Sequence, residues 1–244
     1  MSGSATLPSG KSMKLAVMQP YFLPYIGYFQ LIAAVDTFIV YDNIKYTKKG
    51  WINRNRMLQN GKDVMFSLPL QAASDYLDVR DRELAAEFNR DKLISQIAGS
   101  YKKAPHFETA IPLVEEVLTN QENNLFRFLH QSILIVCKYF DIKTKIIVSS
   151  SIPIDHGLKS QDKVLALCKA VGAGTYVNAI GGTDLYSRER FYESGVELKF
   201  IQSTPFDYQQ FGPEFVPWLS IVDVLMFNPK NVVKSCIMSN YQLI

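Results

Sequence analysis

The chain has 244 residues, of which 48% are apolar and 20% are charged. This composition is typical of a globular protein and excludes a disordered or membrane-embedded class. The formal net charge of +3, from 26 Lys and Arg against 23 Asp and Glu, is too small to indicate nucleic-acid binding by itself.

The three cysteines are widely spaced and form no CxxC motif, which favours buried free thiols in a reducing, cytoplasmic compartment over a disulfide framework or a zinc site. No apolar run approaches the ~20 residues that a transmembrane helix needs, and we expect no membrane partner. Residues 1–12 are rich in Gly and Ser and predict a disordered lead or tag remnant, followed by a single α/β domain over 13–244.

Alternating strand and helix patterns predict a mostly parallel sheet. Residues 14–18 and 36–41 read as buried strands with a short helix at 28–35 between them, which is a βαβ unit. The same rhythm returns later, with strands expected at 145–148, 175–178 and 197–201, and helices at 160–171, 187–194, 218–227 and 231–238. We expect a Rossmann-like fold of the HUP or nucleotidyltransferase type.

The middle of the chain has a different character. Asn60-Gly61 lies between residues 51–59 and 62–70 and predicts an antiparallel hairpin inserted beside the sheet or extending it. Helical periodicity over 84–103, 109–119 and 122–139 predicts a helical insertion or subdomain at 83–140. The hairpin edge could also pair between subunits of an oligomer, although nothing in the sequence requires it.

The first candidate site is the loop after the first strand, where open α/β sheets bind ligands. Its candidate ligand-binding residues are Gln19, Tyr21, Tyr25, Gly27 and Tyr28. The layout is similar to the HxGH pattern of nucleotidyltransferases, but Tyr25 and Tyr28 replace the two histidines, which counts against adenylyl transfer. The alternative is a structural turn that the prolines and aromatic residues hold in place.

The second candidate site follows the second strand, which ends at Asp42. Residues 48–56 carry four cations, among them Lys49, and arginine is well suited to bidentate phosphate contact. Strand alternation places Arg54 and Arg56 on one face, and Trp51, Asn53 and Asn55 on the other. The alternative is a solvated strand face.

Three further segments carry candidate residues. Gly181 and Gly182, followed by Asp184 and Tyr186, lie between a strand and a helix, where a plain turn with Asp184 as helix cap is the alternative. His156 lies in a loop and is a candidate base or a surface residue; no histidine spacing indicates a metal site. Ser220 and Asp223 are three residues apart and could bind a ligand or cap a helix.

Taken together, the segments QPYFLPYIGYFQLI, YDNIKYTKKGWINRNR, GGTDLY and FVPWLSIVDVLMFN resemble the WbqC-like family of bacteria over about Lys14 to Phe227. Members occur with genes for O-antigen and other surface polysaccharides. The resemblance implies a transferase that modifies a nucleotide-activated amino sugar in lipopolysaccharide biosynthesis, for example by N-aminoacyl (glycyl) transfer to a dTDP-linked 4-amino-4,6-dideoxy sugar. Relatives tend to have an acidic pair where this chain has Asp42-Asn43.

Under this hypothesis Lys49, Arg54 and Arg56 hold the pyrophosphate, Trp51 or Tyr25 stacks on a base or sugar, and Asp42 or His156 takes a proton from the amine. The substrates are a nucleotide sugar and an activated donor such as an acyl carrier or aminoacyl-tRNA; no cofactor and no metal is expected. Two alternatives remain open. One is an ATP-dependent nucleotidyltransferase or amino-acid-activating enzyme, and the other is a noncatalytic module that binds nucleotide sugar or tRNA.

Overall fold

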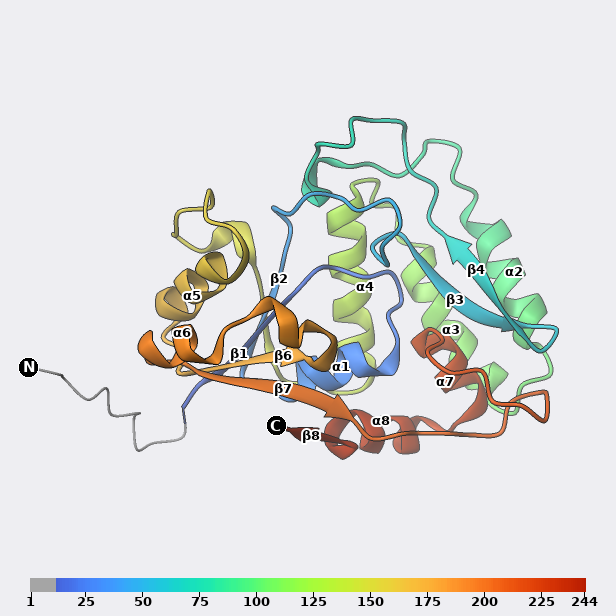
Figure 1. Ribbon diagram of the computed structural model, residues 1–244. Coiled ribbons are helices and arrows are strands. Elements are labelled where there is room, and N and C mark those ends of the chain that lie inside the picture. Colours follow the sequence, from blue (N-terminus) through green and yellow to red (C-terminus); the bar gives the residue numbers. More distant parts are fainter. Residues whose placement is uncertain (1–11) are drawn as a thin grey trace, which may run out of the picture.

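The computed structural model describes residues 12–244 (Figure 1). Its central element is a six-stranded sheet with the order β5-β2-β1-β6-β7-β8. The first five strands in this order are parallel, and β8 runs antiparallel beside β7. The strands are β1 (Lys14–Met18), β2 (Thr37–Val40), β5 (Lys145–Val148), β6 (Thr175–Ala179), β7 (Glu197–Ser203) and β8 (Tyr241–Leu243).

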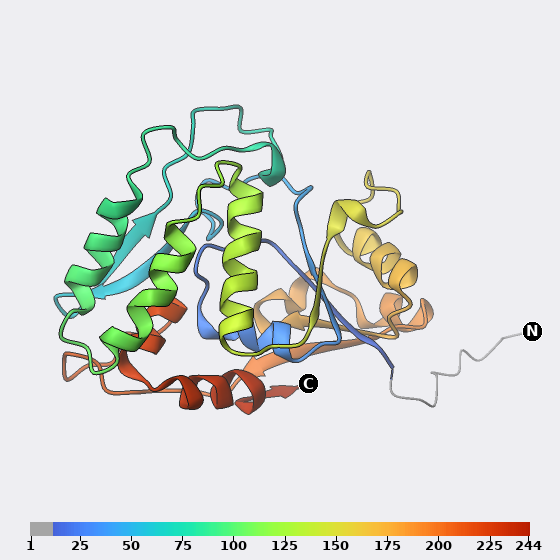
Figure 2. The same ribbon diagram turned by 180° about the vertical axis from the view of Figure 1, so that it is seen from behind.

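Helices cover both faces of this sheet, as Figures 1 and 2 show from opposite sides. One face carries α5 (Ser160–Val171) and α6 (Arg188–Glu193), and the other carries α1 (Ile26–Ala33), α4 (Leu125–Tyr139) and α8 (Lys230–Ser239). Strand alternation divides the core accordingly. In β1, Leu15 and Val17 pack with the α5 side, whereas Ala16 packs with the α1 and α4 side.

The strand order reverses direction at β1. From this central strand the chain adds β2 and then β5 on one side, and β6 and then β7 on the other. In an open parallel sheet such a reversal leaves a crevice beyond the carboxyl ends of the two central strands. The expected Rossmann-like, mostly parallel sheet is therefore confirmed, and its topology points to the ends of β1 and β6.

A second region lies beyond α4, on the side away from α5 (Figure 1). It consists of the separate antiparallel hairpin β3 (Arg54–Gln59) and β4 (Lys62–Ser67), together with α2 (Arg90–Tyr101), α3 (Phe107–Leu118) and α7 (Ile221–Phe227). Asn60 and Gly61 have φ values of +52° and +73°, which is the type I′ turn that their sequence predicts. The apolar cluster of this region continues into the α1 and α4 face of the sheet.

The corrections to the predicted elements concern mainly where they begin. The helix expected over 84–103 begins at Arg90, after Asn89 caps it by accepting the Lys92 amide. The helix expected from Trp218 begins at Ile221, because Trp218 has a φ of +61°. β8 was not predicted from the sequence. The lead expected over 1–12 lies outside the described residues except for its last position.

The helices described between residues 12 and 244 include none with the length and apolar character needed to cross a bilayer.

Candidate functional site

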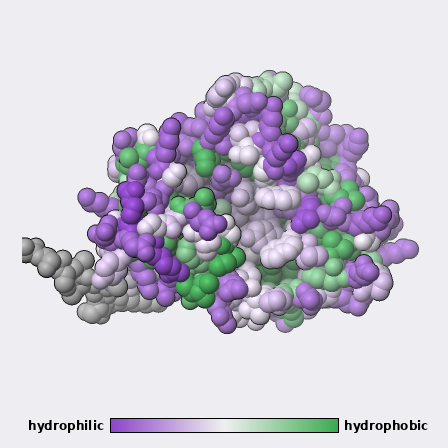
Figure 3. Space-filling model, viewed as in Figure 1, coloured by the Kyte–Doolittle hydropathy of each residue, from purple (hydrophilic) through white to green (hydrophobic). Residues whose placement is uncertain are grey.

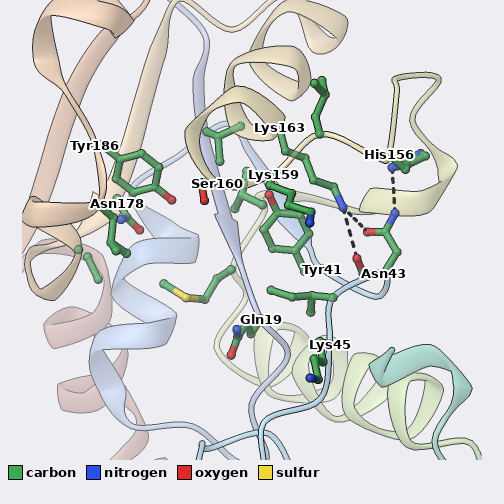
Figure 4. A pocket seen from close by; sticks show the side chains of 18 of the residues that line it. Gln19, Tyr41, Asn43, Lys45, His156, Lys159, Ser160, Lys163, Asn178 and Tyr186 are labelled. Atoms are coloured by element: carbon green, nitrogen blue, oxygen red, sulfur yellow. Dashed lines mark hydrogen bonds between the residues drawn. The ribbon is translucent and has the colours of Figure 1, made fainter. Parts of the chain in front are cut away.

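A cavity of about 910 Å³ opens at the carboxyl ends of β1, β2 and β6, where the strand order reverses (Figure 4). We call it the switch-point cavity. Its size suits a small-molecule ligand. The polar and glycine residues that line it are Gln19, Tyr21, Tyr41, Asn43, Lys45, His156, Gly157, Lys159, Ser160, Lys163, Asn178, Gly181, Gly182 and Tyr186.

One wall of the cavity is a hydrogen-bonded pair, Asn43 and His156. The Asn43 side-chain nitrogen lies 2.8 Å from Nδ1 of His156 (Figure 4). Nε2 of His156 lies 3.1 Å from the Ile152 carbonyl oxygen. Because a carbonyl can only accept, Nε2 carries the proton and Nδ1 accepts from the amide. Both ring nitrogens of His156 are therefore engaged.

Lys163 is the buried cation of this wall. Its residue is 8% exposed, and its ammonium group donates to the Asn43 backbone oxygen and side-chain oxygen at 3.3 and 3.4 Å. The same group lies 5.3 Å from the centre of the Tyr41 ring. Burial lowers the pKa of Lys163, although Asp78 and Asp42 nearby partly oppose this. Within residues 12–244 Lys163 forms no ion pair, so no carboxylate within 4 Å neutralises its charge.

The cavity as a whole is electropositive. Three lysines, Lys45, Lys159 and Lys163, line it, and no Asp or Glu belongs to its described lining. Lys159 and Ser160 also form the start of α5, whose first-turn amide groups receive no capping side chain from Lys159. The positive end of the helix dipole therefore adds to the lysine charges. This combination favours an anionic ligand.

The opposite wall is formed by the end of β6. Gly181 and Gly182 bring backbone close to the cavity, and a side chain at Gly182 would collide with the amide of Asn178. Tyr186 closes this wall, held by edge contacts of its ring with Tyr176 and Phe191. A shallower cavity of about 440 Å³, lined by Asp184 and Arg190 among others, adjoins it. The two cavities share Lys159, Ser160 and Tyr186 in their linings.

A separate hollow of about 260 Å³ lies between the hairpin region and the loop before α7; we call it the aromatic pocket. It is lined by Tyr21, Pro24, Tyr25, Trp51, Asn55, Arg56 and Trp218. Tyr21 also lines the switch-point cavity, so the two adjoin. Figure 3 shows this face of the molecule hollowed near its centre, with pale side chains of intermediate hydropathy in the hollow.

The structure brings together about half of the residues that the sequence proposed. Those in the switch-point cavity are Gln19, Tyr21, His156, Gly181, Gly182 and Tyr186. Those in the aromatic pocket are Tyr21, Tyr25, Trp51, Asn55 and Arg56. Asp184 lies in the adjoining shallow cavity, and Gly27 borders a fourth, apolar cavity. The others line none of these four cavities: Tyr28, Asp42, Lys49, Asn53, Arg54, Ser220 and Asp223.

Several of these other residues make contacts within the protein. The Tyr28 hydroxyl donates to the Gln19 backbone oxygen, and Arg54 donates through Nε to the Gly50 oxygen. Asn53 accepts from Tyr46 and donates to Leu68. Ser220 caps α7 by accepting the Val222 amide, as the capping alternative anticipated, and its hydroxyl donates to the Leu23 oxygen. Lys49 is exposed on the surface.

Asp42 supports the cavity wall from behind. Its Oδ1 accepts from the Ser149 hydroxyl at 2.7 Å and from the Ser150 amide at 2.9 Å, and the same hydroxyl lies 2.6 Å from Asn43 Oδ1. Burial raises the pKa of Asp42, but these hydrogen bonds outweigh burial and hold the pKa below its ordinary value. The Ser149 hydroxyl, which has one proton to donate, thus lies between Asp42 and Asn43, and Asn43 in turn contacts His156 and Lys163.

Sequence reasoning missed Lys163, Lys159 and Lys45. Lys163 carried a recognisable signal, because it shares the buried face of α5 with Val164 and Leu167, where a lysine is unusual. Among residues 12–244, no group of three His, Cys, Asp or Glu side chains is arranged to hold a metal ion.

The fold and the cavity define a Rossmann-like α/β protein with a lysine-lined cavity at its switch point. A family model described as the WbqC-like protein family matches residues 19–235. The chain belongs to this family, which confirms the resemblance found in its motifs. A protein of Mycobacterium tuberculosis, described as uncharacterized protein Rv1507c, is 28% identical over 218 residues, which cover 88% of this chain and 93% of that relative.

Proposed function

We propose that the protein is a transferase that binds a nucleotide-activated amino sugar in the switch-point cavity and modifies its amine. One observation carries the proposal: a cavity of about 910 Å³ at the strand-order reversal is lined by three lysines and no carboxylate. A diphosphate linkage is the anionic part of a nucleotide sugar, and lysines at a helix N-terminus suit it. Family membership supports a role in surface-polysaccharide biosynthesis.

From the sequence, phosphate binding was assigned to the cations in and before β3. We now assign this role to the lysines of the cavity. Lys163 and Lys159 lie one helical turn apart at the start of α5 and both line the cavity, whereas Arg54 and Lys49 line none. A phosphate between the two lysines would supply the ion-pair partner that Lys163 lacks. The part of the cavity beside Gly181 and Gly182 leaves room for the nucleoside.

The specific reaction in this proposal is N-aminoacyl transfer, for example of glycine, to the amine of a dTDP-linked 4-amino-4,6-dideoxy sugar. A neutral amine attacks an activated carbonyl without a covalent enzyme intermediate, and its proton leaves with the group that departs from the donor. The protein then contributes mainly binding and orientation. Asp42 fits a positioning role through Asn43, and His156 fits one as well, since both of its ring nitrogens are engaged.

The test compares Lys163→Met with Lys169→Met, which removes an exposed lysine at the other end of the same helix. Ligand binding to the native state raises the melting temperature. We expect a rise with dTDP- or UDP-linked amino sugars in the wild type and in Lys169→Met. Lys163→Met should bind at least about tenfold more weakly, equivalent to ~1.4 kcal/mol for one charge-assisted contact.

A matched panel decides between the alternatives. Transfer to the sugar amine, detected as a mass increase of the nucleotide sugar with a charged tRNA or acyl carrier as donor, would establish the reaction. A rise in melting temperature with ATP and Mg²⁺ alone would overturn the proposal in favour of nucleotidyl transfer. Tight binding of the nucleotide sugar without turnover with either class of donor would instead mark a binding module.

A further inference from the structure

The two tryptophans of this chain both line the aromatic pocket. Trp51 lies before β3 and is 38% exposed, and Trp218 lies before α7 and is 66% exposed. Large aromatic side chains normally gain stability from burial, so two half-open tryptophans that face one small hollow indicate a surface kept for a ligand.

The backbone of Trp218 adopts a strained conformation. Its φ of +61° lies in the left-handed region, which is an outlier for a bulky side chain. The conformation is held from both sides: Arg56 Nη2 donates to the Trp218 oxygen at 3.2 Å, and the Ser220 amide donates to the Arg56 oxygen at 2.9 Å. Burial of the Trp218 ring does not explain this arrangement, because most of the ring is exposed.

The polar groups of the pocket lining come from Tyr21, Tyr25, Asn55, Arg56 and the two tryptophans. The Nε of Arg56 is buried and has no hydrogen-bond partner among residues 12–244, while its Nη1 pairs with Asp63 at 2.9 Å. The Asn55 amide is already used, since it donates to the backbone oxygens of Phe22 and Leu23. No Asp or Glu belongs to the described lining. This lining suits a ligand with hydroxyl groups at the edge of a ring that packs on aromatic faces.

We propose that the aromatic pocket is a subsite for a pyranose ring of a sugar. Tyr25 and Trp218 meet edge to face, with ring centres 6.0 Å apart and planes at 68°, and so do not form the parallel slot that a flat nucleobase needs. A pyranose packs its C–H face on a single aromatic ring and directs its hydroxyl groups outward, toward the polar groups of Tyr21, Tyr25 and Arg56 that line the pocket. The pocket of about 260 Å³ has room for one ring.

This assignment names where the sugar ring binds and rests on the proposed function only for the identity of that sugar. Tyr21 lines both sites, so a sugar linked to a diphosphate in the switch-point cavity is within reach of the aromatic pocket. A free glycoside should also bind, more weakly, because it lacks the phosphate contacts. The subsite can therefore be tested apart from the nucleotide site.

Intrinsic tryptophan fluorescence reports directly on this pocket, because both tryptophans of the chain line it. We would titrate the full chain with methyl hexopyranosides, methyl 4-amino-4,6-dideoxyhexopyranoside, UDP-linked sugars, UDP and adenosine. We expect a saturable emission change with the glycosides and the UDP-linked sugars. Trp218→Gly should weaken this binding about tenfold while Trp51 still reports, and Trp218→Phe should retain most of it.

Trp218→Gly should leave the melting temperature within about 4 °C of the wild type, since glycine accepts the positive φ and little buried surface is lost. Should that variant fold poorly, Trp51→Leu tests the same subsite from the hairpin side. Lys163→Met should weaken binding of the UDP-linked sugars at least about tenfold but leave glycoside binding unchanged, so the two proposals fail separately. No saturable response to any glycoside, or an equal response to adenosine, overturns the sugar assignment.

Discussion

Asp42 and Asp223 are both buried carboxylates, but they belong to polar networks of opposite character. Asp42 accepts from Ser149 and the Ser150 amide, and its pKa is lowered because these hydrogen bonds outweigh burial. Asp223, in α7, accepts from Tyr101, Tyr208 and Gln210 at 2.7 to 2.8 Å. Burial nevertheless raises the pKa of Asp223, because its cost exceeds the gain from these hydrogen bonds.

The difference lies in what each network leaves unused. We call the Asp223 network closed, because three donors converge on its carboxylate and Asp223 lines none of the four cavities. The Asp42 network continues through Asn43 to Lys163, a cation with no ion pair that faces the switch-point cavity. Buried charge alone therefore does not mark a binding site. A binding site is indicated instead by a buried charge that lacks an ion-pair partner among the described residues and borders a cavity.

The largest effect should come from Asp223→Ala. This change removes the acceptor of two buried hydroxyls and one amide, and we expect a loss of about 4 kcal/mol in the free energy of unfolding. Urea denaturation measures this loss. Asp91→Ala is the matched control, because Asp91 also lies in the first turn of a helix but is exposed; its effect should stay below about 0.5 kcal/mol. An equally small effect of Asp223→Ala would contradict the closed network.

The pH dependence of Asp42 and Asp223 should have opposite signs. The folded pKa of Asp42 lies below its unfolded value of about 3.9, so its stabilisation is present above that pH and is lost as the pH falls through the folded pKa. The advantage of the wild type over Asp42→Asn, about 1 kcal/mol at pH 7, should therefore shrink in acid.

For Asp223 the folded pKa is raised, so the wild type should gain relative to Asp223→Asn as the pH falls toward 4. Unfolding curves at pH 7, 5 and 3 for both variants provide the measurement. If the two differences change in the same direction, the contrast between the networks is wrong.

The smallest effect on stability should come from Lys163→Met. The two hydrogen bonds of Lys163 are long, and a buried ammonium without an ion pair gains little over an apolar side chain of similar length. We expect a change within about 1 kcal/mol of the wild type in urea denaturation, together with the weaker ligand binding described above. A stability loss above about 2 kcal/mol would place Lys163 with Asp223 as a structural charge.

Local patterns predicted most of the secondary structure. The strands at 14–18 and 145–148 and the helix at 160–171 have the bounds that the sequence predicts, because apolar runs and the left-handed Gly172 at the helix end are local signals. β8 was not predicted because its three residues form a strand only through pairing with β7, which is distant in sequence.

The candidate site was predictable only where a motif lies at the end of a strand. Gln19 and Gly181-Gly182 were found in this way, since the carboxyl ends of neighbouring parallel strands meet at one edge of the sheet. The basic run around Arg54 was placed beside the phosphate by its composition, yet Arg54 donates to Gly50 and lines none of the four cavities. Composition reports which charges exist, whereas only packing decides which of them face a ligand.

The sequence by itself therefore determined the α/β class, the type I′ hairpin at Asn60-Gly61 and the family, because each depends on local periodicity, turn chemistry or motif order. Only the tertiary structure decided that Lys163 meets Asn43 across 120 positions, and that Trp51 and Trp218 border one pocket. Both pairings result from the strand order and from the packing of the hairpin against α7. These long-range choices follow from burial of the whole core, which no local pattern encodes.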